Sequence, residues 1–196
     1  MTPPKETRRR APGMSPEQRR VMIIAAALPL VAEHGAKVTT GQVARAAGIG
    51  EGTIFRAFAD KNELLDACMA EAVRPDHAVR EIASIPTDLP LADRLTGAAD
   101  ALDAHLDRMG AVAGALLGSG HRSRAERPPA DSREQSVAAI REAITDLFGD
   151  DAPPLRVPRD QAAAVFLGLL FARPRTPLST GDLVAVFLHG ALAEPS

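Results

Sequence analysis

The sequence contains a single cysteine, Cys68, among 196 residues. One cysteine cannot form a disulfide within the chain, which agrees with a reducing compartment. The chain also lacks a run of about 18 apolar residues, and its basic, proline-rich N-terminus has no secretory core or cleavage site. We therefore expect a soluble, cytoplasmic protein in which Cys68 is either a buried, unreactive thiol or a redox sensor.

Motifs that usually carry catalysis are absent as well. No G-x-x-x-x-G-K-[ST] or G-x-S-x-G element occurs, so nucleotide hydrolysis and esterase chemistry lack support. The five histidines are widely separated and form no H-x-x-x-H or H-E-x-x-H pattern, so we expect no metal site, no cofactor and no enzyme. Asp103, His105 and Asp107 are close in sequence, but helical spacing places the histidine on a different side from the carboxylates. We expect mostly surface charge there, with His105 lining a pocket.

The chain is rich in helical patterns. Apolar residues make up 45% of it, which is enough to bury a sizeable core, and no segment alternates like a strand for long. These patterns, separated by Pro- and Gly-containing turns, predict an all-α protein. Downstream of residue 75, we expect helices at about 76–84, 89–107, 109–118, 131–148, 159–172 and 180–193.

The first helix has clear end signals. Ser15, Pro16 and Gln18 combine an N-cap, a first-turn proline and a capping box, and Gly35 is a natural stop. Helical spacing predicts an apolar stripe made of Val21, Ile24, Ala25, Leu28 and Val31.

Residues 39–64, TTGQVARAAGIGEGTIFRAFADKNEL, predict two short helices joined by a tight turn. Thr39 or Thr40 can cap the first helix, and Gly48 permits a left-handed backbone at the turn. A second helix from about 51 to 59 directs Ile54 and Phe58 inward and leaves its leading edge exposed. This spacing fits a helix-turn-helix, in which the second helix enters the DNA major groove.

A specific set of residues in this segment follows the pattern of a known family: Thr40, Val43, Ala44, Ala47, Gly48, Ile49, Gly52, Thr53, Phe55, Phe58, Lys61 and Leu64. With these residues the segment resembles the DNA-binding domain of the tetracycline-repressor (TetR) family. Three positions depart from that pattern, because Gly50 replaces Ser or Thr, Phe55 replaces Tyr, and Ala57 replaces His or Tyr. Each departure removes a polar contact. Phe55 keeps a ring that can touch a thymine methyl but cannot donate to phosphate.

The resemblance implies an N-terminal three-helix DNA-binding domain followed by a C-terminal helical domain for ligand binding and dimerisation. We expect a disordered basic arm at 1–14, the DNA-binding domain at 15–60 and the regulatory domain at 61–196. The arm either reaches into a minor groove or only adds solubility.

Charge is segregated along the chain. Residues 1–61 hold ten of the 23 Lys and Arg but only five of the 25 Asp and Glu, a charge of +5, which leaves −7 for the remainder. A basic end on an acidic body suits a protein that presents one end to a polyanion.

Position in the motif assigns DNA-contacting roles. We expect Thr40, Thr53, Arg56 and Lys61 to contact phosphates, Gln42 and Glu51 to read bases, Gly52 to allow close approach, and Phe55 to pack on a thymine methyl or sugar. Glu51 has an alternative role, a charge interaction with the N-terminus of its own helix.

For the regulatory domain, the resemblance implies an apolar cavity for a small-molecule effector of unknown identity. Candidate lining residues are His105, Met109, Leu116 and Phe166. The last two helices, at 159–172 and 180–193, have broad apolar faces that either pair with a second subunit or close the monomer's own core.

The expected function is therefore a dimeric transcriptional regulator, most often a repressor in this family, that an effector releases from a palindromic double-stranded operator. One alternative is a helical ligand-binding or sensor protein whose DNA-reading motif has degenerated, as the residues at 50, 55 and 57 suggest. The other is a helical enzyme that uses the C-terminal cavity.

Overall fold

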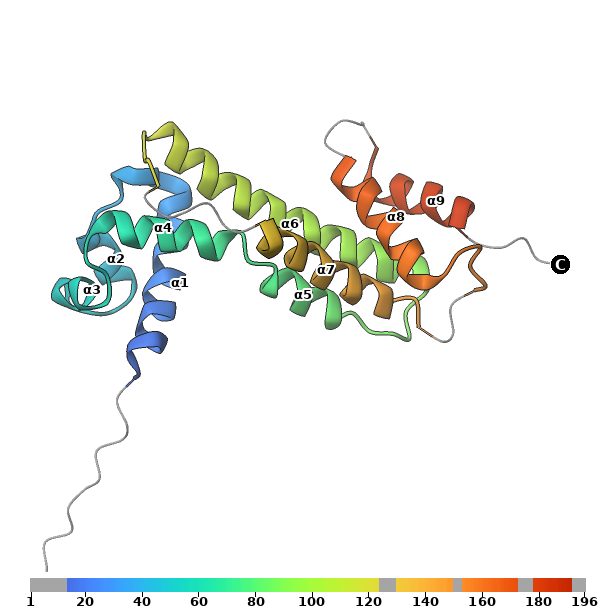
Figure 1. The fold of residues 1–196 in the computed structure, drawn as a ribbon, viewed down its shortest axis with the longest axis horizontal. Helices are drawn as coiled ribbons and strands as arrows, with labels where there is room; N and C mark the ends of the chain where they lie inside the picture. Colours follow the sequence, from blue (N-terminus) through green and yellow to red (C-terminus); the bar gives the residue numbers. More distant parts are fainter. Residues whose placement is uncertain (1–13, 124–129, 150–152, 173–177, 192–196) are drawn as a thin grey trace, which may run out of the picture. The chain divides into compact units, whose positions relative to one another are not determined.

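The computed structural model describes residues 14–123, 130–149, 153–172 and 178–191. Within these ranges the chain is helical and forms no strand, which confirms the predicted all-α class. The helices labelled in Figure 1 are α1 (Pro16–His34), α2 (Thr40–Ala46), α3 (Glu51–Ala57), α4 (Lys61–Ala72), α5 (Asp76–Ala83), α6 (Leu91–Gly118), α7 (Ala130–Asp146), α8 (Arg159–Ala172) and α9 (Thr180–Ala191). A short 3-10 turn, η1 (Gly35–Lys37), follows α1. None of these described helices has the length and apolar character that crossing a membrane requires.

The helices group into two compact units. The first contains α1 to α4 up to Glu71, together with the end of α6 and the residues that follow it, from Val112 onward. The second contains α5, the part of α6 up to Ala111, and α7 to α9. A single helix, α6, thus contributes to both units. The expected domain boundary after residue 60 stays a prediction, and the first unit includes α4 with the helix-turn-helix.

The capping signals of α1 are confirmed. The backbone N–H of Gln18 donates to Ser15 Oγ at 3.2 Å, and that of Ser15 donates to Gln18 Oε1 at 2.9 Å. Gly35 follows the helix with a φ of 56°, a conformation that favours glycine.

The predicted apolar stripe of α1 was right at Val31 and wrong at Val21 and Ala25, which are exposed. The buried residues are Ile23, Ala27 and Val31, whereas Val21 is 64% exposed. The segment from residue 21 to 32 is almost entirely apolar, so the sequence pattern does not determine which face is buried. Packing against the other helices of the unit makes that choice.

The prediction of two separate helices at 89–107 and 109–118 was also wrong. The structure has one helix, α6, over 28 residues from Leu91 to Gly118. Gly110 lies within it, and an isolated glycine costs a helix only about 1 kcal/mol, which neighbouring packing can offset. Without a proline, the segment has no obligatory break.

The end of α6 packs closely on the end of α1 within the first unit. A Cβ on Gly35 would lie 2.2 Å from the carbonyl oxygen of Ala115, so the backbones can approach only because residue 35 is glycine. The Ala36 N–H donates to Ser119 Oγ at 2.7 Å, and His121 Nε2 lies 2.9 Å from Asp66 Oδ1. These contacts attach residues 115–121 to η1, directly after α1, and to α4.

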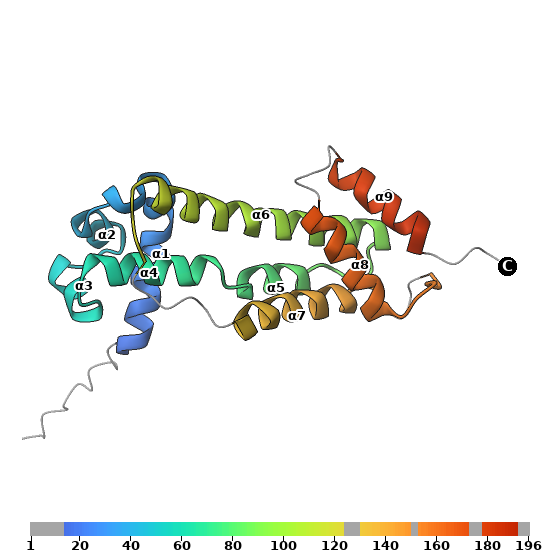
Figure 2. The ribbon, with the colours of Figure 1, turned by 45° about the horizontal axis from the view of Figure 1, so that its top comes forward.

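The second unit has its own apolar core. In the views of Figure 1 and Figure 2, α5 and α7 lie side by side, and α8 packs on α7. The ring of Phe187 on α9 lies 5.0 Å from that of Phe166 and 6.3 Å from that of Phe148. The buried core residues include Leu95, Ala98, Leu102, Ile140, Ile144, Phe148, Phe166, Leu170, Val184 and Phe187.

Candidate nucleic-acid interface

Helix α2 begins with a capping box. Of the two expected threonines, Thr39 is the N-cap: the Gln42 N–H donates to Thr39 Oγ1 at 3.1 Å, and the Thr39 N–H donates to Gln42 Oε1 at 2.8 Å. The side-chain oxygen of Gln42 therefore supports the helix end. Its role in reading a base stays a prediction.

The turn between α2 and α3 is set by glycine. Gly48 has a φ of 66°, as expected, and the Ile49 N–H donates to the Ala44 carbonyl at 3.0 Å. This hydrogen bond spans five positions in sequence and closes the end of α2, as in a Schellman motif. It fixes the direction in which the chain enters α3.

Helix α3 has a buried side and an open side. Ile54 and Phe58 are buried, as predicted, while Phe55 is 53% exposed and Gly52 and Arg56 are also exposed. A Cβ on Gly52 would meet nothing within 4 Å, so glycine is not required there by the packing of this chain. The outward face is thus free to approach another molecule.

The first turn of α3 contacts α2. Glu51 lies in that turn and accepts a hydrogen bond from Thr40 Oγ1. Gly50, the N-cap of α3, provides no side-chain bond to the helix. In the free protein, Thr40 and Glu51 are partners, and their roles toward phosphate and base stay predictions.

Lys61, expected to contact phosphate, has a partner within the protein. Its Nζ donates to the carbonyl oxygen of Ala36 at 2.6 Å, and the side chain is half-buried. This bond ties the start of α4 to η1, and an ammonium group has two further N–H donors. Sequence reasoning did not find this internal bond.

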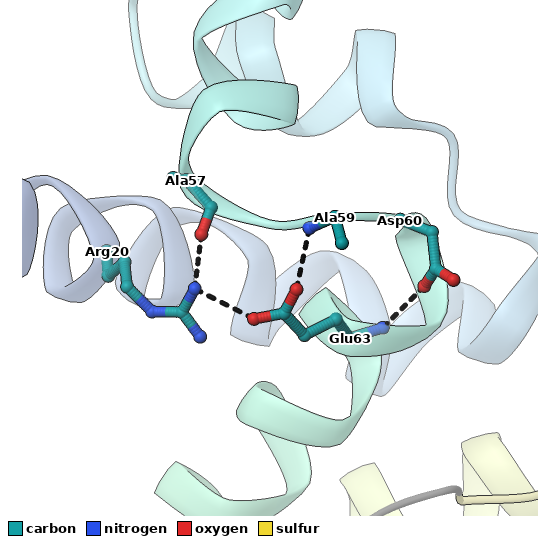
Figure 3. A network of polar contacts seen from close by, with 5 residues as sticks. All are labelled: Arg20, Ala57, Ala59, Asp60 and Glu63. Carbon is teal, nitrogen blue, oxygen red and sulfur yellow. Dashed lines mark hydrogen bonds and ion pairs between the residues drawn. The ribbon is translucent and has the colours of Figure 1, made fainter.

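A network centred on Arg20 holds the far end of α3 (Figure 3). Arg20 Nη1 donates to the carbonyl oxygen of Ala57 and lies 2.9 Å from Glu63 Oε1. The guanidinium also lies 4.2 Å from the centre of the Phe58 ring, within the range of a cation–π contact. Helix α1 is thereby connected to the end of α3 and the start of α4.

Glu63 completes the network. Its second oxygen, Oε2, accepts from the Ala59 N–H at 2.6 Å, and the Glu63 N–H donates to Asp60 Oδ1 at 2.9 Å. The hydrogen bond from Ala59 and then that from Arg20 lower the pKa of the Glu63 carboxyl. The D-x-x-E spacing of residues 60–63 is a helix-start signal, but the partner 43 residues away could not be found from local sequence.

The four candidate effector residues do not share one unit. His105, Met109 and Phe166 belong to the second unit, whereas Leu116 belongs to the first. His105 is 6% exposed, and burial followed by the nearby charge of Arg108 lowers its pKa. Phe166 is part of the packed core. Asp107 is exposed, as expected for surface charge, and Asp103 is half-buried. An effector role for these residues stays a prediction.

Cys68 is completely buried on α4. Burial, and then the charge of Glu71, raises the pKa of the thiol to about 12. The structure therefore supports the unreactive alternative.

The comparisons with known proteins agree with this geometry. The sequence profile described as bacterial regulatory proteins of the tetR family matches residues 23–68, from the middle of α1 into α4. Three solved structures share the fold: a transcriptional regulator from Rhodococcus sp. Rha1 (TM-score 0.55, 20% identity, 92% of this chain and 100% of that one), a TetR transcriptional regulator from Streptomyces coelicolor (TM-score 0.52, 24% identity, 87% and 97%), and a second tetR-family regulator from Streptomyces coelicolor (TM-score 0.51, 21% identity, 88% and 78%). Residues 23–68, which form the helix-turn-helix and its supports on α1 and α4, are therefore similar to the tetR family of bacterial regulatory proteins.

Proposed function

We propose that this DNA-binding regulator is a repressor that binds a two-fold symmetric operator as a homodimer and that a small molecule bound to its second unit releases it. The observation that carries the proposal is the open face of α3. Gly52, Phe55 and Arg56 are exposed there, while Ile54 and Phe58 fix the opposite face in the core. A recognition helix needs this arrangement to enter the major groove.

Charge supports the same orientation. The first 61 residues carry a net charge of +5 and the remainder −7. Phosphates attract the basic end, and like-charge repulsion keeps the acidic part away from the duplex.

The proposed DNA contacts follow from the position of each side chain. Thr40, Thr53, Arg56 and Lys61 contact phosphates, Gln42 and Glu51 reach base edges, Gly52 permits close approach, and Phe55 packs on a thymine methyl or sugar. The basic arm is proposed to add a minor-groove contact. Residues 1–13 of that arm lie outside the described part of the chain.

Exposed apolar side chains on α8 and α9 support dimerisation. Val165 and Phe171 on α8 and Val186 on α9 are exposed to solvent in the single chain. A second copy would cover these side chains, and a two-fold dimer presents two recognition helices to a palindromic site.

The effector is proposed to act by changing the distance between the two α3 helices of the dimer. Successive major grooves on one side of the duplex lie about 34–36 Å apart, so a ligand that favours another spacing lowers operator affinity. A coupling of about 1–3 kcal/mol would reduce that affinity roughly 5- to 150-fold. The proposed determinants are His105, Met109 and Phe166 of the second unit, and Leu116, also a candidate, belongs to the first unit.

The test is selection of bound duplexes from a random pool by the purified full-length protein at near-physiological salt. Titration of the selected sequence against a scrambled duplex then measures specificity. A two-fold symmetric winner is the expected result. Weak, salt-sensitive binding without sequence preference would instead support a sensor protein whose DNA-reading motif has degenerated.

A further inference from the structure

We propose that Arg20 of α1 is a positioning residue for α3, and that Glu63 of α4 acts with it, so that this arginine serves DNA reading through its contacts within the protein rather than by binding phosphate. The inference rests on the proposed function, because it concerns how α3 is held for sequence recognition.

Helix α3 depends on its surroundings for its orientation. It has only seven residues, and isolated helices shorter than about 12–15 residues are marginal in water. Its N-cap, Gly50, provides no side-chain bond, and Gly52 in its first turn has low helix propensity. Contacts with neighbouring helices must therefore fix where α3 points.

Arg20 supplies such contacts at the C-terminal end of α3. Its guanidinium donates to the carbonyl of Ala57, the last residue of the helix, where a cation also interacts favourably with the helix dipole. The same group lies over the ring of Phe58, which is buried. One side chain thus contacts both the backbone end and the apolar anchor of α3.

Glu63 holds the other side of the same segment. Its two oxygens divide between Arg20 and the Ala59 N–H, so the guanidinium and the carboxylate together bracket residues 57–59 (Figure 3). These residues form the connection from α3 to α4. A planar guanidinium can serve two acceptors and a ring at once, whereas a lysine ammonium lacks that geometry.

This arrangement predicts that loss of the positive charge of Arg20 and loss of the negative charge of Glu63 change operator binding in the same direction. If Arg20 bound phosphate, loss of its charge would weaken binding to every duplex, and loss of the nearby Glu63 charge would strengthen it. If both residues position α3, either loss lowers binding to the operator selectively. The sign of the Glu63 effect therefore separates the two roles.

The experiment compares Arg20→Lys, Arg20→Gln, Glu63→Gln and the double variant Arg20→Gln/Glu63→Gln in the full-length protein. Arg19→Gln is the matched control, because Arg19 is the neighbouring arginine and donates to the Met14 carbonyl. Affinity for the selected operator and for a scrambled duplex is measured over a range of salt, and thermal melts correct for the folded fraction.

We expect Arg20→Lys, Arg20→Gln and Glu63→Gln each to lower operator affinity about 3- to 30-fold, and the double variant to lose less than the product of the Arg20→Gln and Glu63→Gln losses. Affinity for the scrambled duplex and its salt slope should match those of the wild type for Arg20→Lys and Glu63→Gln. A stronger operator complex for Glu63→Gln, with a salt slope flatter by about 0.9 per subunit for Arg20→Gln, would assign Arg20 to phosphate. Equal losses of affinity for the operator and for the scrambled duplex would mean that Arg20 and Glu63 only stabilise the fold. That result would also overturn the proposal.

A second measurement does not need DNA. Hydrogen exchange in the free protein should be faster at the Phe58 amide, which donates to Ile54 at 2.8 Å, in Arg20→Lys and Glu63→Gln but not in Arg19→Gln. Unchanged protection there would overturn the positioning role. If the wild type selected no sequence, the proposed function would fail, and this measurement would still decide the inference about Arg20.

Discussion

At Gly52, helix stability and the proposed DNA contact favour different residues. A Cβ at this position points into open space on the exposed face of α3, so Gly52→Ala should raise the free energy of unfolding by about 0.5 kcal/mol through better helix propensity. If α3 enters the major groove as proposed, the same methyl group would stand between the helix and the bases, so operator affinity should fall. Thermal melts and operator titrations check both signs. An alanine variant that bound operator as well as the wild type would remove the close-approach role.

Lys61 allows a similar test of binding to phosphate. Lys61→Ala should weaken binding to all duplexes and flatten the salt slope by about 0.9 for each phosphate that a subunit no longer neutralises. Because Lys61 also donates to the Ala36 carbonyl, thermal melts must accompany the titration. An unchanged slope would mean that the internal bond is its whole role.

Cys68 should be unreactive in the folded protein. Burial raises the pKa of its thiol from an ordinary value of 9.0 to about 12, so the folded state disfavours the thiolate that reacts. The stability linked to this group is fully present below pH 9 and is lost as the pH rises toward 12. A thiol reagent at about pH 8, below the ordinary pKa of a cysteine, should label Cys68 only after addition of denaturant. Rapid labelling without denaturant would restore the redox-sensor alternative.

Single residues were predictable where their role is local. Thr39 and Gly48 act on backbone groups within five positions, so the sequence shows them directly, whereas the capping role of Gln42 was not predicted. Arg20 and Glu63 are separated by 43 positions, and Lys61 and Ala36 by 25. Their pairing depends on how α1, α3 and α4 pack, which no local pattern contains.

At the scale of elements, the close approach of α1 and α6 predicts a strong effect from one methyl group. Gly35→Ala would place a Cβ 2.2 Å from the Ala115 carbonyl and would strain a backbone at positive φ. The free energy of unfolding should fall by about 3 kcal/mol or more. Denaturant titration is the measurement. Gly114→Ala in α6, next to Ala115, is the control. A Cβ there would meet nothing within 4 Å, and the substitution should stabilise α6 slightly.

Helix ends were easier to predict than helix faces or helix continuity. Ser15 and Gly35 mark the limits of α1 by backbone chemistry, so both appeared in the sequence. The buried face of α1 could not be predicted in this way, because nearly every residue between Val21 and Val31 is apolar. The expected break between residues 107 and 109 is absent, and α6 runs through it without interruption.

At the scale of the whole molecule, the dimer proposal depends on α8 and α9. Val186 is 58% exposed on α9, so Val186→Asp should be tolerated by a monomer but should bury an unpaired charge in a dimer. Association should weaken by about 3 kcal/mol or more, and sedimentation should show monomers. Val21→Asp on α1 is the control, since that valine is similarly exposed. A variant that remained dimeric would place the interface elsewhere.

The charge segregation of the chain was visible in the sequence, whereas its division into units was not. A boundary near residue 60 follows from the end of the motif, but the first unit also includes α4 and residues from Val112 onward. Segments distant in sequence meet there through the Gly35 contact with Ala115.

The shared helix α6 has a consequence for the synthesis of the protein. Residues 14–71 leave the ribosome before the rest of the first unit, because Val112 and Leu116, which are buried in the finished molecule, come about 40 positions later. The first unit cannot complete its buried core until that part of α6 has been translated. A nascent chain, or a fragment cut after α4, would therefore lack part of its own interior. The ability to bind DNA should appear only once most of α6 exists.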